Sequence, residues 1–242
     1  VLAENKGIRD RIRIQTKCGI CKGYYDLSKE HIIESVDNSL SRLQTDYVDL
    51  LLLHRPDALM DGEEIAEAFD ILKKSGKVKQ FGVSNFNGAQ ISYLRATCSH
   101  PLLVNQMQLS IAHAGMIRQG METNTMLEGS AVRDMAVLDY CREHKITIQA
   151  WSPLQFGMFE GNFVGHEKYS KLNEVLQRLS EELGVSKEAV AISWILRHPA
   201  NFQVLIGTMN EEHLKEICMA NKIYLTRQEW YELYCGAGYT LP

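Results

Sequence analysis

The sequence predicts an α/β protein built as a (β/α)8 TIM barrel. Short apolar runs alternate with amphipathic helical patterns along the chain, and polar residues come where the apolar runs end. Such alternation gives a parallel sheet, and a barrel carries its functional residues at the carboxyl ends of the strands. An open dinucleotide-binding sheet would carry GxGxxG after a strand, and this motif is absent from the sequence. The barrel is therefore favoured over the open sheet.

Six runs rich in leucine or β-branched residues are predicted to be strands. The segment DLLLLHRPD, Asp49 to Asp57, has four consecutive leucines followed by His54, which predicts a strand buried on both faces that ends in polar residues. The six predicted strands are 12–17, 47–54, 78–84, 102–108, 146–152 and 202–208.

Between these strands, apolar residues recur at helical spacing. Asp61 with Glu64 three residues later predicts a helix start, and Gly76 and Gly184 stand where helices are predicted to end. The predicted helices are 28–43, 62–75, 89–96, 131–144, 168–183 and 187–197.

The strand count falls short of a full barrel, which has eight strands. Residues 1–11 resemble the end of a helix that leads into the first predicted strand. We therefore expect residues 1–242 to form one barrel domain that is incomplete at its N-terminus, holding about six of the eight strands. Either the natural protein starts earlier, or the chain completes itself in another way.

Composition narrows the class of protein. A chain of 242 residues with 45% hydrophobic and 23% charged residues is typical of one globular domain. The net charge of −4, with scattered Lys and Arg, argues against a nucleic-acid partner. No apolar run approaches the roughly 18 residues of a membrane span, so we expect no membrane partner and a cytoplasmic location.

Six cysteines include one CxxC pair, Cys18 and Cys21. A CxxC pair serves redox chemistry or forms half of a zinc site. No second pair or nearby histidine completes such a site in the sequence, so plain reduced thiols are favoured and no metal is expected.

The joint order of six segments resembles the aldo-keto reductases, NADPH-dependent oxidoreductases built on a TIM barrel. The resemblance covers about residues 8 to 220, and the common order at consecutive strand ends makes it specific although each segment alone is weak. The segments are RIQTK, SLSRLQTDYVDLLLLHRPD, GKVKQFGVSNF, NQMQLS, ITIQAWSPL and VLIGTMNEEHLKE.

The resemblance implies two catalytic residues, Lys17 and His54. The family uses a tyrosine acid helped by a lysine, a histidine and an aspartate, and Lys17 and His54 match the lysine and the histidine. A carbonyl that receives hydride gains negative charge on oxygen, which needs a proton donor and placed hydrogen-bond donors. The family's tyrosine and aspartate lie ahead of the lysine strand, on a segment that this sequence lacks. Tyr24 and Tyr25 follow Lys17, but the resemblance does not place the proton donor there.

The resemblance also implies a site for NADP(H). Ser84, Asn85 and Gln106 match residues that hydrogen-bond the nicotinamide carboxamide, and Trp151 matches an aromatic residue that stacks on the ring. Many members have lysine and arginine at the two positions occupied here by Gly207 and His213, which weakens the expected preference for NADPH over NADH. The positions matched to the pyrophosphate and the adenosine end are Ser152, Leu154, Gly207, Thr208, Asn210 and His213.

Two functions follow from the resemblance. In the first, the protein is an NADP(H)-dependent oxidoreductase that reduces a small-molecule aldehyde or ketone by hydride transfer from the nicotinamide. In the second, the barrel binds the cofactor without significant turnover and serves as a sensor or a partner-binding subunit, because the barrel-type β subunits of potassium channels resemble this family.

Overall fold

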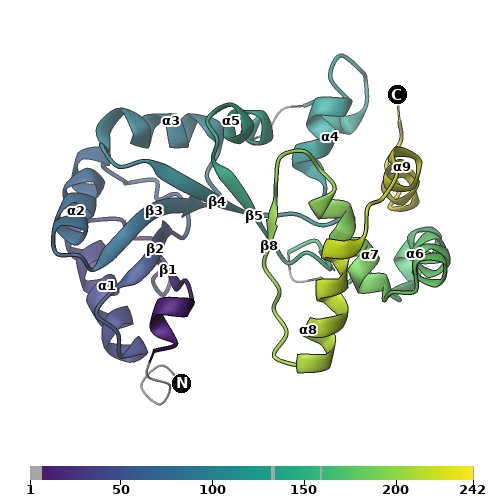
Figure 1. The fold of residues 1–242 in the computed structure, drawn as a ribbon. Coiled ribbons are helices and arrows are strands. Elements are labelled where there is room, and N and C mark those ends of the chain that lie inside the picture. Colours follow the sequence, from purple (N-terminus) through teal and green to yellow (C-terminus); the bar gives the residue numbers. More distant parts are fainter. Residues whose placement is uncertain (1–6, 132–133, 159, 242) are drawn as a thin grey trace. The chain divides into compact units, whose positions relative to one another are not determined.

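The computed structural model describes residues 7–131, 134–158 and 160–241. It is an α/β fold in which six strands form one parallel sheet and follow each other in chain order (Figure 1). The predicted α/β class and all six predicted strands are confirmed, although the last strand is much shorter than the predicted 202–208. The strands are β1 (Gln15–Cys18), β2 (Val48–Leu53), β3 (Val78–Ser84), β4 (Leu102–Gln108), β5 (Thr147–Trp151) and β8 (Gln203–Val204).

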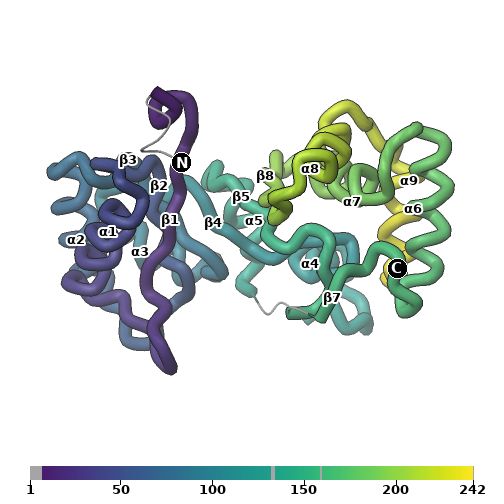
Figure 2. The backbone as a smooth tube through the Cα atoms, turned by 90° about the horizontal axis from the view of Figure 1, so that it is seen from below, coloured from purple at the N-terminus to yellow at the C-terminus, as the bar shows by residue number. Residues whose placement is uncertain are grey.

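The chain divides into two compact units, and the first holds the residues up to Asn105 together with Glu143–Ile146. In this unit β1 pairs with β2 and β2 with β3, each in parallel register. Figure 2 shows β1 passing beside α1, the helix that follows it. The helices of this unit are η1 (Arg9–Arg11, a 3-10 helix), α1 (Lys29–Leu43), α2 (Gly62–Lys74) and α3 (Gly88–Thr97).

Strand β2 is the buried centre of the first unit. All of its residues are buried, which confirms the prediction of a strand covered on both faces. Leu50 and Leu52 pack with Val104 in one apolar cluster, and the intervening Leu51 and Leu53 are also fully buried. Because successive side chains of a strand point to opposite faces, the two pairs of leucines fill the two sides of the sheet.

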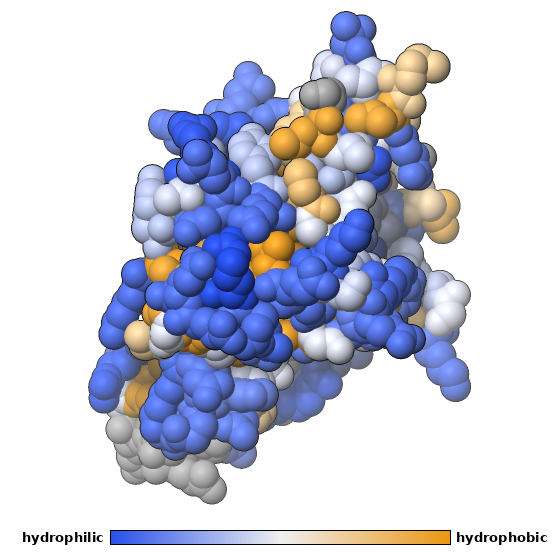
Figure 3. Space-filling view, turned by 90° about the vertical axis from the view of Figure 1, so that its right-hand side faces the viewer, coloured by the Kyte–Doolittle hydropathy of each residue, from blue (hydrophilic) through white to orange (hydrophobic). Residues whose placement is uncertain are grey.

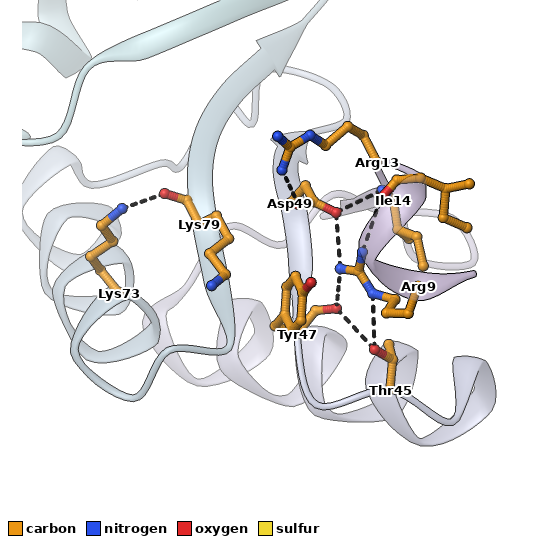
Figure 4. A network of polar contacts seen from close by, with 9 residues as sticks. Arg9, Arg13, Ile14, Thr45, Tyr47, Asp49, Lys73 and Lys79 are labelled. Carbon is orange, nitrogen blue, oxygen red and sulfur yellow. Dashed lines mark hydrogen bonds and ion pairs between the residues drawn. The ribbon is translucent and has the colours of Figure 1, made fainter. Parts of the chain in front are cut away.

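Asp49 on β2 is the one charged residue of this buried strand, and its carboxylate has three partners (Figure 4). Oδ2 accepts a hydrogen bond from Ile14 N at 2.9 Å and lies 2.9 Å from Arg9 Nη2, and Oδ1 accepts from Arg13 Nη1 at 3.1 Å. Arg9 also stacks over the ring of Tyr47, 3.7 Å from its centroid. This network ties the segment ahead of β1 to the start of β2.

The second unit holds Gln106–Arg142 and the residues from Thr147 onward. Here β5 pairs with β8 in parallel, and β6 (Gln155–Phe156) pairs with β7 (Gly161–Asn162) in a short antiparallel hairpin. The helices are α4 (Gly115–Met121), η2 (Glu128–Ser130), α5 (Val137–Glu143), η3 (Glu167–Tyr169), α6 (Ser170–Leu183), α7 (Lys187–Leu196), α8 (Glu211–Cys218), η4 (Met219–Lys222) and α9 (Arg227–Gly236).

Two indole rings join α7 to α9 in the core of the second unit. Trp194 and Trp230 stack with ring centroids 4.6 Å apart, and each Nε1 donates to the other's carbonyl oxygen at 3.0 Å. The reciprocal bonds satisfy both buried indole donors. Figure 3 shows that the face carrying the outer helices of this unit is mostly hydrophilic, with hydrophobic residues in small groups.

The predicted helix boundaries are mostly confirmed. Asp61 caps α2 by accepting hydrogen bonds from Glu63 N and Glu64 N, and Gly184 ends α6 in the left-handed conformation with φ of +65°. The helix predicted over 131–144 begins only at Val137 in the described residues, and residues 132–133 of that prediction lie outside them. No described helix has both the length and the apolar character needed to cross a membrane.

Candidate functional site

The ends of β1 and β2 bring Lys17 and His54 together in the first unit. The backbone N–H of His54 donates to Cys18 O at 2.9 Å, so the residue after β2 is fixed beside the end of β1. Lys17 and His54 both line a cavity of about 370 Å³, whose walls come from the end of β1 and from α1. The juxtaposition expected from the sequence is therefore present, while the catalytic roles of the two residues stay a prediction.

Burial and charge set the protonation of this pair. Burial lowers the pKa of the Lys17 ammonium. The pKa of His54 is lowered first by burial and then by the positive charges of Lys17 and Arg55. Because an imidazole titrates near pH 6.5 without perturbation, His54 is neutral at pH 7. A neutral ring donates one hydrogen bond and accepts another.

Ser84 and Asn85 lie at the end of β3, next to His54. Ser84 is buried, and Asn85 has a φ of +60°, in the left-handed region that asparagine tolerates better than most residues. Asn85 Nδ2 donates to Ser84 Oγ at 2.9 Å and to the carbonyl oxygen of His54 at 3.5 Å. The strand end thus holds a hydroxyl and an amide in a fixed arrangement beside the histidine.

Gln106 on β4 belongs to a chain of glutamine side chains in the second unit. Its buried Nε2 donates to Gln149 Oε1 at 3.2 Å, and Gln149 Nε2 donates to Gln203 Oε1 at 3.0 Å. The two neighbours hold the Gln106 amide in one orientation. Gln149 and Gln203 were not singled out from the sequence; the signal available was a glutamine in each of two largely apolar predicted strands, 146–152 and 202–208.

The end of β5 and the segment after it carry three more predicted residues. Trp151 is partly buried at the strand end, and Ser152 has a φ of +50°, so the chain turns sharply there. Ser152 O accepts a hydrogen bond from Gln155 N at 3.0 Å. Leu154 packs against the apolar cluster that includes Ala189 and Ile217. Leu154 therefore has a packing role in this unit whatever else it contacts.

Gly207, Thr208, Asn210 and His213 lie together at the start of α8. Asn210 caps the helix by accepting from His213 N at 3.2 Å, and Thr208 Oγ1 accepts from Asn210 N at 3.1 Å. A Cβ atom added at Gly207 would meet no heavy atom within 4 Å apart from its chain neighbours, so the space next to this residue is open. Glu211 and Glu212 follow the capping residue Asn210. One carboxylate oxygen of each lies 2.9 Å from Lys215 Nζ.

Comparison with known proteins identifies the family. The model of the aldo/keto reductase family matches residues 1–234. The chain belongs to this family. The aldo/keto reductase is 40% identical over 239 residues to 6-dehydroglucose reductase of Agrobacterium fabrum, which covers 94% of this chain and 73% of that protein. Both the resemblance seen in the sequence and the oxidoreductase class are therefore confirmed.

A solved structure and a more distant relative extend the comparison. The crystal structure of a thermostable aldo-keto reductase in complex with the inhibitor epalrestat matches with a TM-score of 0.74 and 25% identity, covering 94% of this chain and 72% of that one. A probable voltage-gated potassium channel subunit beta of Arabidopsis thaliana is 28% identical over 212 residues, covering 78% of this chain and 61% of that protein. The likeness to the solved structure confirms the barrel-type fold of this aldo/keto reductase.

Proposed function

We propose that this protein is an NADP(H)-dependent oxidoreductase that reduces small-molecule aldehydes or ketones. The observation that carries the proposal is the placement of Lys17 and His54 in one cavity at the ends of adjacent parallel strands. When bound, NADPH supplies the hydride that moves from C4 of the nicotinamide to the carbonyl carbon. The family membership and the oxidoreductase relatives support this reaction class.

Lys17 and His54 act on the carbonyl oxygen. Negative charge grows on that oxygen as the carbonyl is reduced, and donors already in place stabilise it without rearranging. The Lys17 ammonium supplies positive charge, while the neutral ring of His54 donates its N–H, orients the substrate and shares in the transfer of the proton that turns the reduced oxygen into the hydroxyl of the alcohol. The partly buried position of Lys17 strengthens its effect, because charge interactions are screened less away from water.

The side chains proposed to hold the cofactor fit its chemistry. A carboxamide has two N–H donors and one carbonyl acceptor, and the Ser84 hydroxyl with the Asn85 and Gln106 amides offers groups of both kinds. Trp151 offers an aromatic face for the nicotinamide ring. Ser84 and Asn85 support the proposal from the first unit, and Gln106 and Trp151 support it from the second.

The start of α8 is proposed to hold the adenosine end. Backbone N–H groups at a helix N-terminus bind phosphate, and the open approach at Gly207 supports such contact. Glu211 and Glu212 place negative charge in the same turn, partly neutralised by Lys215. We therefore propose that NADPH is preferred over NADH by a smaller factor than lysine and arginine at positions 207 and 213 would give.

The proposal is tested by following the loss of NADPH absorbance with a panel of aldehydes and ketones, with NADH in parallel. We expect the full-length protein to show turnover and its Lys17→Met variant to lose it. Lys22→Met, at an exposed lysine in the next loop, is the matched control and keeps wild-type turnover. Turnover that survives in Lys17→Met would contradict the proposed role of the cavity.

A cofactor-binding sensor or partner-binding subunit is the second candidate, and the likeness to a potassium channel β subunit favours it. The samples of the NADPH assay also distinguish the enzyme from the cofactor-binding subunit. Quenching of tryptophan fluorescence by NADPH, with no substrate reduced, would support the binding role and exclude the enzyme.

A further inference from the structure

The loop after β1 folds back on itself and brings Cys21 and Asp26 close to α1. Cys21 N donates to Tyr24 O and Asp26 N donates to Gly19 O, both at 3.0 Å, and an antiparallel bridge pairs Ile20 with Tyr25. Gly19 makes the turn with a φ of +101°, where an added Cβ would lie 2.4 Å from a methyl carbon of Leu27. Only glycine suits this turn.

The folded loop places a thiol, an imidazole and a carboxylate in a row. Cys21 Sγ lies 3.7 Å from His31 Nε2, and His31 Nδ1 lies 4.0 Å from Asp26 Oδ2. The other carboxylate oxygen of Asp26 accepts from Ser28 N at 2.9 Å, which fixes its orientation. The negative charge of Asp26 at 4.0 Å favours a proton on Nδ1 by electrostatic attraction, and in that tautomer Nε2 presents its lone pair to the thiol. This is the order of groups that activates a cysteine nucleophile.

The two cysteines of the CxxC pair differ in surroundings. Cys18 is buried, its thiol donates to Leu52 O at 3.9 Å, and burial raises its pKa to about 12. Cys21 is partly exposed and contacts an imidazole that is itself 26% exposed. Reactive cysteines occupy partly exposed sites of this kind, whereas buried ones are inert. Nothing in the sequence indicated the contact between Cys21 and His31, which lie ten residues apart.

His31 also belongs to the wall of the cavity that holds Lys17 and His54, as does Ile20, the residue before Cys21. Two cations, Lys17 and Arg42, line that cavity, and no acidic side chain is among its described lining residues. Positive charge attracts and polarises a carbonyl oxygen. An electrophile that carries a carbonyl group is therefore favoured next to the imidazole.

We propose that Cys21 is a nucleophilic modification site for α,β-unsaturated aldehydes and ketones. The thiol proton moves to His31 Nε2, and the sulfur forms a bond to the β-carbon. The C=C electron pair moves toward the carbonyl to give an enolate, and the proton on His31 then passes to the α-carbon. The product is a thioether, all atoms and electrons are accounted for, and no oxidant is needed. Asp26 is a positioning residue that orients the imidazole.

Acrolein is the probe for this proposal, with adduct formation at each cysteine followed by peptide mass spectrometry at pH 7. Cys218 and Cys235 are exposed thiols of the same chain and serve as internal references. We expect Cys21 to react about tenfold or more faster than either reference, because a placed general base contributes at least that much. Equal rates at the three cysteines would overturn the proposal.

Two variants test the imidazole in opposite directions. His31→Gln is expected to reduce the Cys21 rate to that of the references. Ser35→Ala is expected to raise it, because Ser35 Oγ lies 3.2 Å from His31 Nε2 and competes with the thiol for the lone pair. Unfolding of His31→Gln would be seen as labelling of the buried Cys98 and Cys141, and Ser35→Ala then decides the test. A Cys21 rate unchanged in Ser35→Ala would contradict the role of His31.

Discussion

The backbone N–H of His54 donates to the carbonyl oxygen of Cys18 at 2.9 Å, and this bond continues the parallel pairing of β2 with β1 by one step. The parallel register places Lys17 beside Leu52 and Cys18 beside Leu53. Lys17 and His54, which are far apart in the sequence, are thereby brought to one cavity by the pairing of their strands.

The closeness of Lys17 and His54 predicts a measurable electrostatic coupling. In Lys17→Met, loss of the ammonium raises the pKa of His54, because that charge is one of the causes that lower it. The rise stays incomplete, since burial is the larger cause. Titration of the His54 ring followed by NMR measures the shift, with Lys22→Met as the control that leaves it unchanged. An unaltered His54 pKa in Lys17→Met would show that the two groups are not neighbours.

The side-chain amide of Asn85 can be removed by mutation without changing the backbone conformation at this position. Glycine adopts a φ of +60° readily, so Asn85→Gly keeps the turn and removes only the side chain. We expect NADPH affinity to fall by about tenfold, the loss of one hydrogen bond, with little change in thermal stability. Asn124→Gly is the matched control, because Asn124 is exposed and has a φ of +61°. Equal NADPH affinity in Asn85→Gly and wild type would remove Asn85 from the cofactor site.

The carboxylate of Asp49 stabilises the start of β2 in a pH-dependent manner. Burial disfavours its charge, but the Ile14 N–H and the guanidinium groups of Arg13 and Arg9 outweigh this and lower its pKa. Asp49→Asn should reduce the free energy of unfolding by about 1–3 kcal/mol at pH 7, because it breaks a buried hydrogen-bonded ion pair.

The sign of the pH dependence follows from the lowered pKa of Asp49. The stabilisation is fully present above the unfolded pKa, near 3.9, and is lost as the pH falls through the lower folded value. Urea unfolding of wild type and Asp49→Asn should therefore converge in acid. Asp46→Asn, at an exposed carboxylate, is the control and should match wild type throughout. A difference between wild type and Asp49→Asn that stays constant into acid would refute the role of the charge.

His198 in the second unit predicts a loss of stability that begins at a higher pH than the loss predicted for Asp49. Burial first, and then the positive charge of Arg142, lower its pKa to about 4, and the ring stacks on Phe202 at 5.0 Å. The unfolded chain binds a proton near pH 6.5, so wild type loses stability as the pH falls from about 6.5 to about 4. His198→Gln lacks this loss. Thermal unfolding across that range checks the prediction, and parallel curves for the two proteins would contradict it.

Much of the fold follows from local sequence patterns. The leucines of β2 and the helical spacing of α1 and α6 have strong periodicity, so their bounds were predicted within a few residues. Helices α4 and α9 were not predicted. Both lie in segments where glycine or aromatic residues obscure the apolar stripe, and α9 depends on the stacking of Trp230 on Trp194, a contact between distant parts of the chain.

The site was predictable where it depends on strand ends and not where it depends on loops. Lys17, His54 and Asn85 stand at strand ends that local patterns predict, while their roles in the site come from the resemblance to the aldo-keto reductases and stay a prediction. The contact of Cys21 with His31 depends on the turn at Gly19 and on the hairpin that follows, which no periodic pattern indicates. The glutamine chain behind Gln106 requires the parallel pairing of β5 with β8 to be known.

Transfer of deuterium from NADPH tests the central claim most directly. The protein is supplied with NADPH that carries deuterium at C4 on the transferred face, in two samples with opposite labelling, and with an aldehyde that it reduces. The account predicts an alcohol product with deuterium on the former carbonyl carbon in one sample and not in the other. NADPH binding without labelled alcohol in either sample would contradict the assignment of this aldo/keto reductase as a hydride-transferring enzyme.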